Sequence, residues 1–299
     1  MNALPFVLPN TECFQLRSAG GLDYKISVAL PLSYGHTSVR YPVLYVLDAD
    51  VLFGTFCEMT RMRGALQEID ELVVVGVGYP DGTDFATWVQ RRTHDFSAAT
   101  WQEDSPSRQG VAGVLSAMGK EMHVGGADDF LDFLTRDVQQ LVTSRYRVTA
   151  GDQGLFGDSA AGNLVGQSLF RRQQPFSKFI LNSPAFAIND GLVHRLEEEF
   201  AAQHQDLPAV VYMSAGASEL FHLAGGGIVS GTTRLAESLQ LRGYPGLRLQ
   251  CDVLPSETHI TAISDGLQRG LTACWPGQPL ELNASRNANL ARNVNSSSG

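Results

Sequence analysis

The chain has 299 residues, 43% of them hydrophobic and 18% charged, with a formal net charge of −9. This length suits one large α/β domain, and the acidic balance argues against nucleic acid or an anionic membrane as a partner, because basic patches bind both. No apolar run approaches the ~18 residues of a transmembrane helix, and the first residues lack the basic and apolar regions of a secretory signal. The four cysteines follow no C-x-x-C spacing, so we expect free thiols, no zinc site and a cytoplasmic location.

The first part of the chain predicts a parallel sheet. Apolar and polar residues alternate over residues 23–30, as in a half-buried antiparallel strand near a sheet edge. Residues 42–48 and 72–78 are continuous apolar runs, which are typical of strands covered on both faces. Residues 53–67 between them can form a helix, so these segments predict a β-α-β unit with a right-handed crossover.

Residues 80–126 show no clear period and are rich in Gly, Ser, Thr, Asp and Gln. A stretch of this length without a period is typical of a functional loop or of disorder. We expect residues 97–124 to form a lid that excludes water and shapes a substrate pocket. Trp88 and Trp101 offer apolar contact area to a substrate, with ordinary packing as the alternative for each.

Strands and helices alternate again after this segment, beginning with an amphipathic helix that opens at residues 125–128. Strands are predicted at residues 154–158, 179–182, 210–215 and 247–254, and helices at residues 160–171, 191–203, 232–241 and 261–272. We therefore predict a single α/β domain over residues 1–277. The Asn- and Ser-rich residues 278–299 predict a disordered tail.

One serine lies where an apolar strand meets a helix. Residues 155–162 read Leu-Phe-Gly-Asp-Ser-Ala-Ala-Gly, with Ser159 at the junction. A strand–turn–helix elbow needs small neighbours, because the two backbones approach closely while the serine is held exposed at the sheet edge. Ala161 stands where the G-x-S-x-G pattern has its second glycine. The pattern predicts Ser159 as a nucleophile, with a structural serine in a tight turn as the alternative.

A serine nucleophile needs a base, and the base needs an acid to orient it. In the α/β-hydrolase fold the chain order is serine, acid, histidine. His259 follows the last predicted strand and precedes the last predicted helix, which is where this fold places its base. His194 and His204 lie on a polar helix and are expected to face solvent.

The acid is expected after the strand at residues 210–215. Glu219 is the first acidic residue beyond that strand and is the predicted third member of a triad. Glu257, two residues before the histidine, and Asp252, within the last strand, are the alternatives. A solvated or helix-capping Glu219 is the remaining interpretation.

Two backbone N–H groups should form an oxyanion hole. The first is that of Ala160, which opens the helix after the nucleophile. The second is expected in the loop after residues 42–48, from Asp50 or Val51. The acidic residues of that loop could instead fix its backbone, which is the commoner role of Asp in turns.

These residues together resemble the putative-esterase family of α/β-hydrolases, and most closely its branch that contains the enterobactin and bacillibactin esterases. The shared segments are the elbow and residues 41–48, 75–80, 91–96, 125–134, 183–185 and 257–260. The resemblance implies a mostly parallel sheet with helices on both faces and an insertion as a lid, with Ser159 and His259 in catalytic roles. Some members of the branch work with a Ser-His dyad, so the need for Glu219 stays open.

Two positions depart from the family pattern, since Asp158 stands where the family often has histidine and Ala161 where it often has glycine. The acid could shift the pH dependence or simply point into the turn. In this branch the arginine of an R-x-x-D-[F/Y/L] segment lines the substrate site, and Arg92 matches it, with Arg91 as the alternative. A structural ion pair between Arg92 and Asp95 is the competing interpretation.

We therefore expect a serine carboxylic-ester hydrolase that forms an acyl-enzyme with a small-molecule ester and needs no metal or organic cofactor. Acyl transfer to an alcohol and thioester hydrolysis use the same residues and remain alternatives. A non-catalytic binding protein of the same fold is the rival from another class. The acyl and alcohol parts of the ester, and the oligomeric state, stay open.

Overall fold

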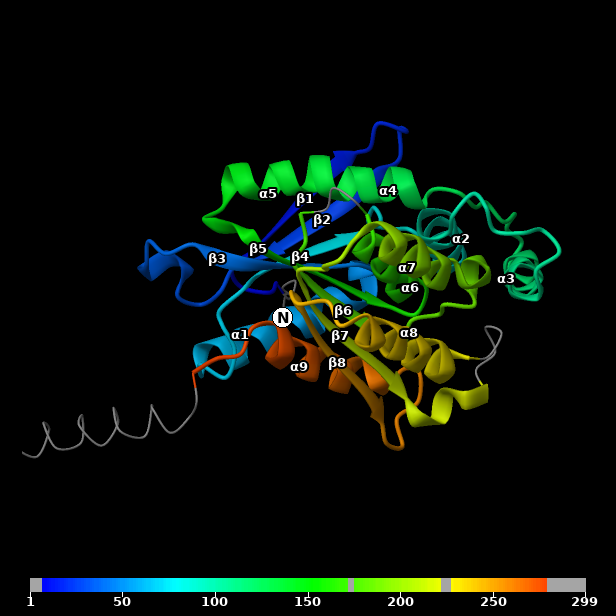
Figure 1. Ribbon diagram of the computed structural model, residues 1–299. Coiled ribbons are helices and arrows are strands. Elements are labelled where there is room, and N and C mark those ends of the chain that lie inside the picture. The colour runs from blue at the N-terminus through cyan, green and yellow to red at the C-terminus, as the bar shows by residue number, and fades with distance from the viewer. Residues whose placement is uncertain (1–6, 172–174, 222–226, 279–299) are drawn as a thin grey trace, which may run out of the picture.

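A computed structural model describes residues 7–171, 175–221 and 227–278, which form one central sheet between helices (Figure 1). The sheet has eight strands in the order β1-β2-β4-β3-β5-β6-β7-β8. β1 and β2 are antiparallel to their neighbours, and the strands from β4 to β8 are parallel. The strands are β1 Thr11–Arg17, β2 Asp23–Ala29, β3 Tyr41–Val46, β4 Val73–Gly78, β5 Val148–Asp158, β6 Lys178–Asn182, β7 Ala209–Gly216 and β8 Leu247–Leu254.

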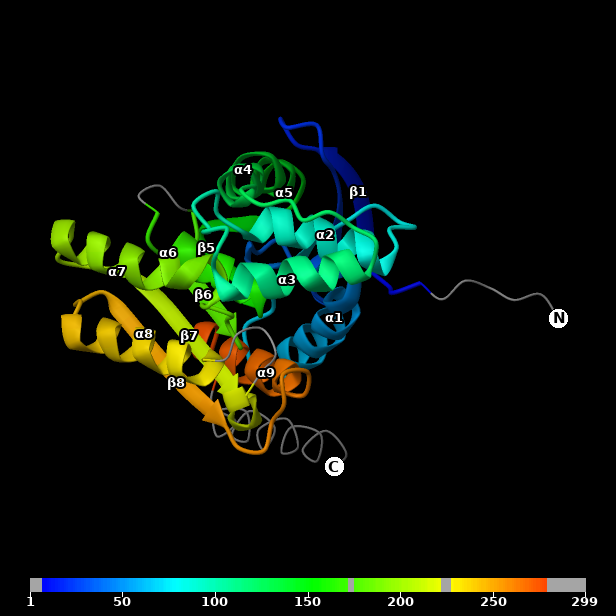
Figure 2. The same cartoon turned by 90° about the vertical axis from the view of Figure 1, so that its right-hand side faces the viewer.

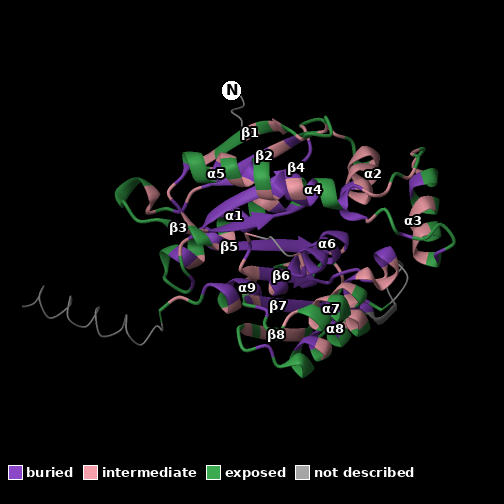
Figure 3. Cartoon of the chain, turned by 45° about the horizontal axis from the view of Figure 1, so that its top comes forward, coloured by how far each residue is buried: buried purple, intermediate pink, exposed green. Residues whose placement is uncertain are grey.

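Helices cover both faces of the sheet. One face packs against α1 (Ala49–Ala65) and α9 (Ala262–Cys274), and the other against α2 and α4 to α8. The bounds are α2 Phe85–Phe96, α4 Ala127–Phe133, α5 Gln139–Arg145, α6 Ala160–Leu169, α7 Leu192–Gln203 and α8 Ile228–Arg242, with a π-helical turn Leu134–Val138 between α4 and α5. Successive residues of a strand point to opposite faces, so the central strands are buried along most of their length, as Figure 3 shows.

The predicted β-α-β order is present, and the α/β-hydrolase fold class is confirmed. Each parallel strand predicted from an apolar run is a strand of the sheet, and the helix predicted at residues 160–171 is α6. β1 was not predicted, because it is an edge strand with no fully buried residue and lacks an apolar signal. The predicted tail from residue 278 onward lies outside the described residues except for Gln278 itself.

The segment of residues 80–126 is not a structureless loop. It contains α2 and α3 (Pro106–Ala117), and α3 lies on the outer side of α2, at the end of the molecule that faces the viewer in Figure 2. The loop before α3 is fixed to η3 (Ile188–Gly191), where Asn189 and Asp190 accept hydrogen bonds from the N–H groups of Ala98 and Gln102. None of the helices within the described ranges is both long and apolar enough to cross a membrane.

Candidate active site

The candidate nucleophile Ser159 occupies a constrained turn between β5 and α6. Its backbone has φ of 58° and ψ of −118°, and α6 begins at the next residue. A residue other than glycine with a positive φ is strained by about 1–3 kcal/mol, so surrounding contacts must hold the Ser159 backbone in this conformation. Ser159 N–H donates to the Asn182 carbonyl at 3.0 Å, and its own carbonyl accepts from Asn163 and Ala185 N–H at 3.0 Å each.

Small residues around the turn are required by close backbone approach. A Cβ atom at Gly157 would lie 2.4 Å from the carbonyl oxygen of Ala161, and one at Gly162 would lie 3.0 Å from that of Asn182. The glycine of the G-x-S pattern is therefore demanded by the return of α6 over β5. Ala161 itself is fully buried, so a methyl group is accommodated where the family often has glycine.

The structure brings His259 and Glu219 into contact. His259 lies in the loop between β8 and α9, Glu219 lies in η4 (Ala217–Phe221) after β7, and His259 Nδ1 is 2.5 Å from Glu219 Oε1. The two loops are joined by a bond from Ser218 N–H to the Glu257 carbonyl, 3.0 Å long. They approach so closely that a Cβ at Gly216 would lie 2.4 Å from that same carbonyl oxygen.

Glu219 is a buried carboxylate with three hydrogen-bond partners. Its other oxygen accepts from Ser183 Oγ at 2.9 Å and from Gly216 N–H at 2.7 Å. Burial alone would raise the pKa of Glu219, but the bonds from His259, Ser183 and Gly216 lower it below its ordinary value. The sequence missed Ser183 as a partner, although its position directly after β6 places it at the same sheet edge.

The pKa of His259 is raised. Burial would lower it, but the bond to Glu219 and the charge of Asp158 outweigh that effect. The two rival acids do not make this contact. Asp252 accepts from the Tyr212 hydroxyl at 3.0 Å, and Glu257 meets the site through its backbone carbonyl.

Asp158, the acid beside the nucleophile, is also buried. Its Oδ1 accepts from Asn182 Nδ2 at 2.6 Å, and Asn182 Oδ1 in turn accepts from Ser214 Oγ at 2.7 Å. Burial raises the pKa of Asp158 to about 7, against the opposing influence of His259 and Asn182. The carboxyl therefore titrates near neutral pH, and its partner Asn182 was not found from the sequence.

Arg92 pairs with Asp48 and not with Asp95, so the competing sequence interpretation was wrong. Its Nε and one terminal nitrogen donate to the two carboxylate oxygens of Asp48 at 3.0 and 2.7 Å. The guanidinium carbon lies 4.8 Å from the ring centre of Trp88 and 5.5 Å from that of Phe96. These contacts hold the guanidinium in one orientation.

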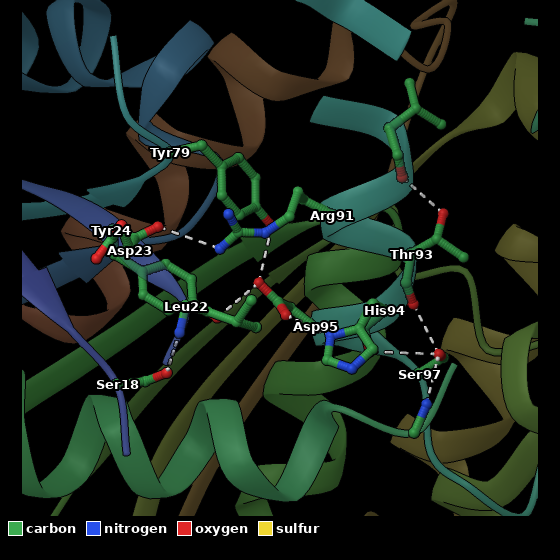
Figure 4. A network of polar contacts seen from close by, with 12 residues as sticks. Ser18, Leu22, Asp23, Tyr24, Tyr79, Arg91, Thr93, His94, Asp95 and Ser97 are labelled. Atoms are coloured by element: carbon green, nitrogen blue, oxygen red, sulfur yellow. Dashed lines mark hydrogen bonds and ion pairs between the residues drawn. The ribbon is translucent and has the colours of Figure 1, made fainter. Parts of the chain in front are cut away.

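Asp95 belongs to a separate network, drawn in Figure 4. It accepts from the hydroxyls of Tyr24 and Tyr79 at 2.9 and 3.2 Å, and one oxygen lies 2.8 Å from His94 Nδ1. Arg91, the alternative to Arg92, stands over the rings of the same two tyrosines and donates to the Asp23 carbonyl at 3.1 Å. Arg91 therefore supports strand β2, while Arg92 lines the cavity beside Ser159.

A cavity of about 340 Å³ opens next to Ser159. Its walls come from α2, α3, η3 and the elbow, and Ser159, Ala160 and Arg92 line it. Trp101 is part of the wall with 2% of its surface exposed, and its indole N–H donates to Ser107 Oγ at 3.2 Å. Trp88 instead lines a separate hollow of about 500 Å³.

The predicted oxyanion donors differ in their backbone surroundings. Val51 N–H already donates to the Asp48 carbonyl at 3.2 Å as α1 begins. The prediction that Val51 supplies an oxyanion donor was therefore wrong. Asp50 is the second residue of α1, and N–H groups at the start of a helix have no intrahelical carbonyl to reach. The Asp50 side chain holds the loop, because its carboxylate accepts from Tyr79 N–H at 3.0 Å. Ala160 is likewise at the start of α6, so its N–H also has no intrahelical carbonyl to reach.

No group of three or more His, Cys, Asp or Glu side chains is placed to hold a metal ion within residues 7–171, 175–221 and 227–278. A mostly parallel sheet, a serine on a strained elbow at its edge and a histidine–carboxylate pair later in the chain define the class as a serine hydrolase of the α/β-hydrolase fold.

Comparisons with known proteins give the family. Residues 18–206 match the family described as "Putative esterase", and the chain belongs to this family of ester hydrolases. The chain is 27% identical over 273 residues to the ferri-bacillibactin esterase BesA of Bacillus subtilis, covering 89% of this chain and 90% of that protein. It is 29% identical over 186 residues to the siderophore triacetylfusarinine C esterase of Aspergillus fumigatus, covering 60% and 58% of the two chains.

Solved structures show the same fold over nearly the whole chain. The BES protein from Bacillus cereus superposes with a TM-score of 0.78 at 25% identity, covering 92% of this chain and 99% of that one. The siderophore hydrolase EstB from Aspergillus nidulans superposes with a TM-score of 0.75 at 25% identity, covering 92% and 98%. The predicted resemblance is confirmed.

Proposed function

We propose that this esterase acts through a Ser159–His259–Glu219 triad. The observation that carries the proposal is the 2.5 Å contact between His259 Nδ1 and the buried Glu219 carboxylate. A carboxylate at Nδ1 keeps the proton on that nitrogen, so Nε2 is the nitrogen that would accept the proton of a serine hydroxyl. Ser159 is the serine that the elbow exposes at the same edge of the sheet.

In the first half of the proposed reaction, Ser159 Oγ attacks the ester carbonyl carbon while His259 Nε2 takes the hydroxyl proton. The N–H groups of Ala160 and Asp50 stabilise the negative oxygen, and His259 returns the proton to the leaving alcohol. In the second half, water attacks the acyl-enzyme and gives its proton to His259. The bond to the acyl carbon then breaks and His259 returns the proton to Ser159 Oγ, so one ester and one water yield one acid and one alcohol.

The substrate in this proposal is a small-molecule ester. The relatives named above suggest siderophore esters as the first natural compounds to test. Action in the cytoplasm is supported by the cysteines Cys13, Cys57, Cys251 and Cys274, which are all free thiols in the structure.

Hydrolysis of a p-nitrophenyl ester series by the wild type and by Ser159→Ala tests the nucleophile. We expect kcat to fall about 10³-fold or more, since the attacking oxygen is lost. A fluorophosphonate should label the wild type at Ser159 and leave the variant unlabelled. Wild-type turnover by the variant would show that another residue is the nucleophile.

A further inference from the structure

The cavity beside Ser159 has an apolar interior. Val89 and Phe96 of α2, Val111 and Val114 of α3, and Ile188 of η3 contribute to its wall. α3 contributes part of this wall, and Figure 2 shows the helix at the end of the molecule that faces the viewer. The volume of about 340 Å³ corresponds to roughly ten atoms of the size of a water molecule, at ~30 Å³ each.

Four polar side chains of the wall already use their donor hydrogens in bonds within the protein. Besides the Trp101 bond to Ser107, three hydroxyls donate to main-chain carbonyls: Thr93 to Val89 at 2.8 Å, Ser97 to Thr93 at 2.6 Å and Ser107 to Ala187 at 3.0 Å. A ligand with many hydroxyl or amide groups would have to break these bonds or leave its own groups unpaired, which is costly in a buried site.

The charge of the wall is balanced. Arg92 is the charged residue that lines the cavity, and its bidentate bond to Asp48 neutralises it. An anionic substituent would therefore meet a compensated guanidinium, and a cationic one would meet no carboxylate of the wall. An uncharged substituent fits these walls best.

The position of the cavity relative to His259 says which part of the ester it holds. The leaving alcohol must lie within hydrogen-bond reach of His259, because that residue protonates it. His259 is not among the residues that line the cavity, whereas Ser159 and Ala160 are. The part of the ester that extends into the cavity is therefore the part that remains on the serine.

We propose that this cavity is an acyl pocket for an uncharged apolar acyl group of up to about ten non-hydrogen atoms, and that α3 sets its depth at Gly110. The inference rests on the proposed serine mechanism and adds the substrate class to it. Gly110 lines the cavity at a point where it is itself exposed, and a Cβ there meets no atom within 4 Å. A larger side chain at residue 110 would therefore occupy pocket space without displacing a neighbour.

Gly113 supplies a matched control on the same helix. Like Gly110, it is exposed and a Cβ there meets no atom within 4 Å, but it does not line the cavity. Gly110→Leu and Gly113→Leu make the same chemical change within α3, so both gain helix propensity to the same degree. A difference in kcat/KM between the two variants therefore comes from the position of residue 110 in the cavity wall.

The test measures kcat/KM of the wild type and both variants on p-nitrophenyl acetate, butyrate, octanoate and palmitate. We expect the wild type to prefer octanoate over acetate and palmitate. The kcat/KM of Gly110→Leu should fall about tenfold or more on octanoate and stay within about twofold of wild type on acetate. Losing the contacts of a few methylene groups with a pocket lowers kcat/KM by about this factor. Gly113→Leu should keep the wild-type profile.

Two esters with the same atoms divided differently fix the orientation. Gly110→Leu should slow ethyl octanoate and leave its isomer octyl acetate unchanged. The proposal is overturned if octyl acetate is the slowed ester, if both glycine variants change the profile alike, or if neither does. Fluorophosphonate labelling of Ser159 keeps this result separate from the mechanism, because a filled acyl pocket leaves the nucleophile reactive, whereas a wrong nucleophile fails to label in the wild type.

Discussion

Two buried carboxyl groups lie near His259, and their surroundings shift their pKa values in opposite directions. Glu219 follows β7 and receives hydrogen bonds from His259, Ser183 and Gly216, so its pKa is lowered. Asp158 ends β5, and its side chain accepts from Asn182 while the charge of Asp48 lies nearby, so burial dominates and its pKa rises to about 7. Burial alone therefore does not determine the charge of a carboxyl group at this sheet edge.

The difference between the two groups comes from the number of donors that the backbone and neighbours supply. η4 turns the chain so that Gly216 N–H and Ser183 Oγ both point at one Glu219 oxygen. Asp158 lies at the end of a strand, where the main-chain donors are already used by the sheet. One carboxyl is thus a fixed negative charge, and the other gains or loses a proton near neutral pH.

The largest loss of activity is expected when the negative charge of Glu219 is removed. Glu219→Gln keeps the size of the side chain but removes the charge that selects the His259 tautomer. We expect kcat/KM on a p-nitrophenyl ester to fall about 10²- to 10⁴-fold, with little change in KM. Steady-state kinetics of the purified variant measure this directly.

The two acids that competed with Glu219 in the sequence are the controls. Glu257→Gln and Asp252→Asn should keep activity within about threefold, because neither side chain bonds His259 in the structure. A fully active Glu219→Gln would mean that a Ser-His dyad is sufficient.

The sheet and the elbow could be predicted because their physical signals are local. Strands buried on both faces are apolar along their length, so residues 42–48 and 72–78 could be predicted as strands. The elbow needs glycine and alanine at fixed offsets from Ser159. Glu219 was predicted from chain order alone, as the first acidic residue after the strand that precedes the last one.

The helix α3 and the fine structure of the site could not be predicted, because they depend on contacts between distant segments. α3 contains Gly110 and Gly113 and buries only Leu115, so it has almost no apolar period. The partner of Arg92 is Asp48, which lies 44 positions earlier in the chain. The N–H of Val51 was assigned to substrate from its position after a strand, but the start of α1 at Ala49 already uses it.

Asp158→Asn should stabilise the protein in a pH-dependent way. The pKa of Asp158 is raised on folding, so the folded state binds its proton more tightly than the unfolded state. The wild type therefore loses stability as the pH rises from the ordinary aspartate value of ~3.9 towards about 7, and the loss is constant above that. Asparagine does not ionise and can still accept the bond from Asn182 through its own Oδ1.

Thermal melts across this range measure that effect. We expect the Tm of Asp158→Asn to exceed that of the wild type by about 3 °C or more at pH 8, and the gap to shrink as the pH falls towards 4. A constant gap across the range, or a lower Tm at pH 8, would show that Asp158 is not held with a raised pKa.

The smallest effect, and the sharpest test of the contrast, is the pH dependence of catalysis. The negative charge of Asp158 raises the pKa of His259, and His259 acts as a base only when it is neutral. Removing that charge in Asp158→Asn should lower the pKa of His259 and move the acidic limb of the kcat/KM profile to lower pH by about half a unit to one unit. In the wild type the two groups titrate as a coupled pair, so the limb should also be broader than in the variant.

Asp252→Asn provides the matched control for this profile, because it makes the same change at an acid that bonds Tyr212 and not the histidine. Its acidic limb should coincide with that of the wild type. A limb of Asp158→Asn that stays in place, or moves to higher pH, would mean that Asp158 is already protonated when His259 titrates. Glu219 would then be the carboxylate that sets the pKa of the base, and the Asp158 side chain would act only through its bond to Asn182.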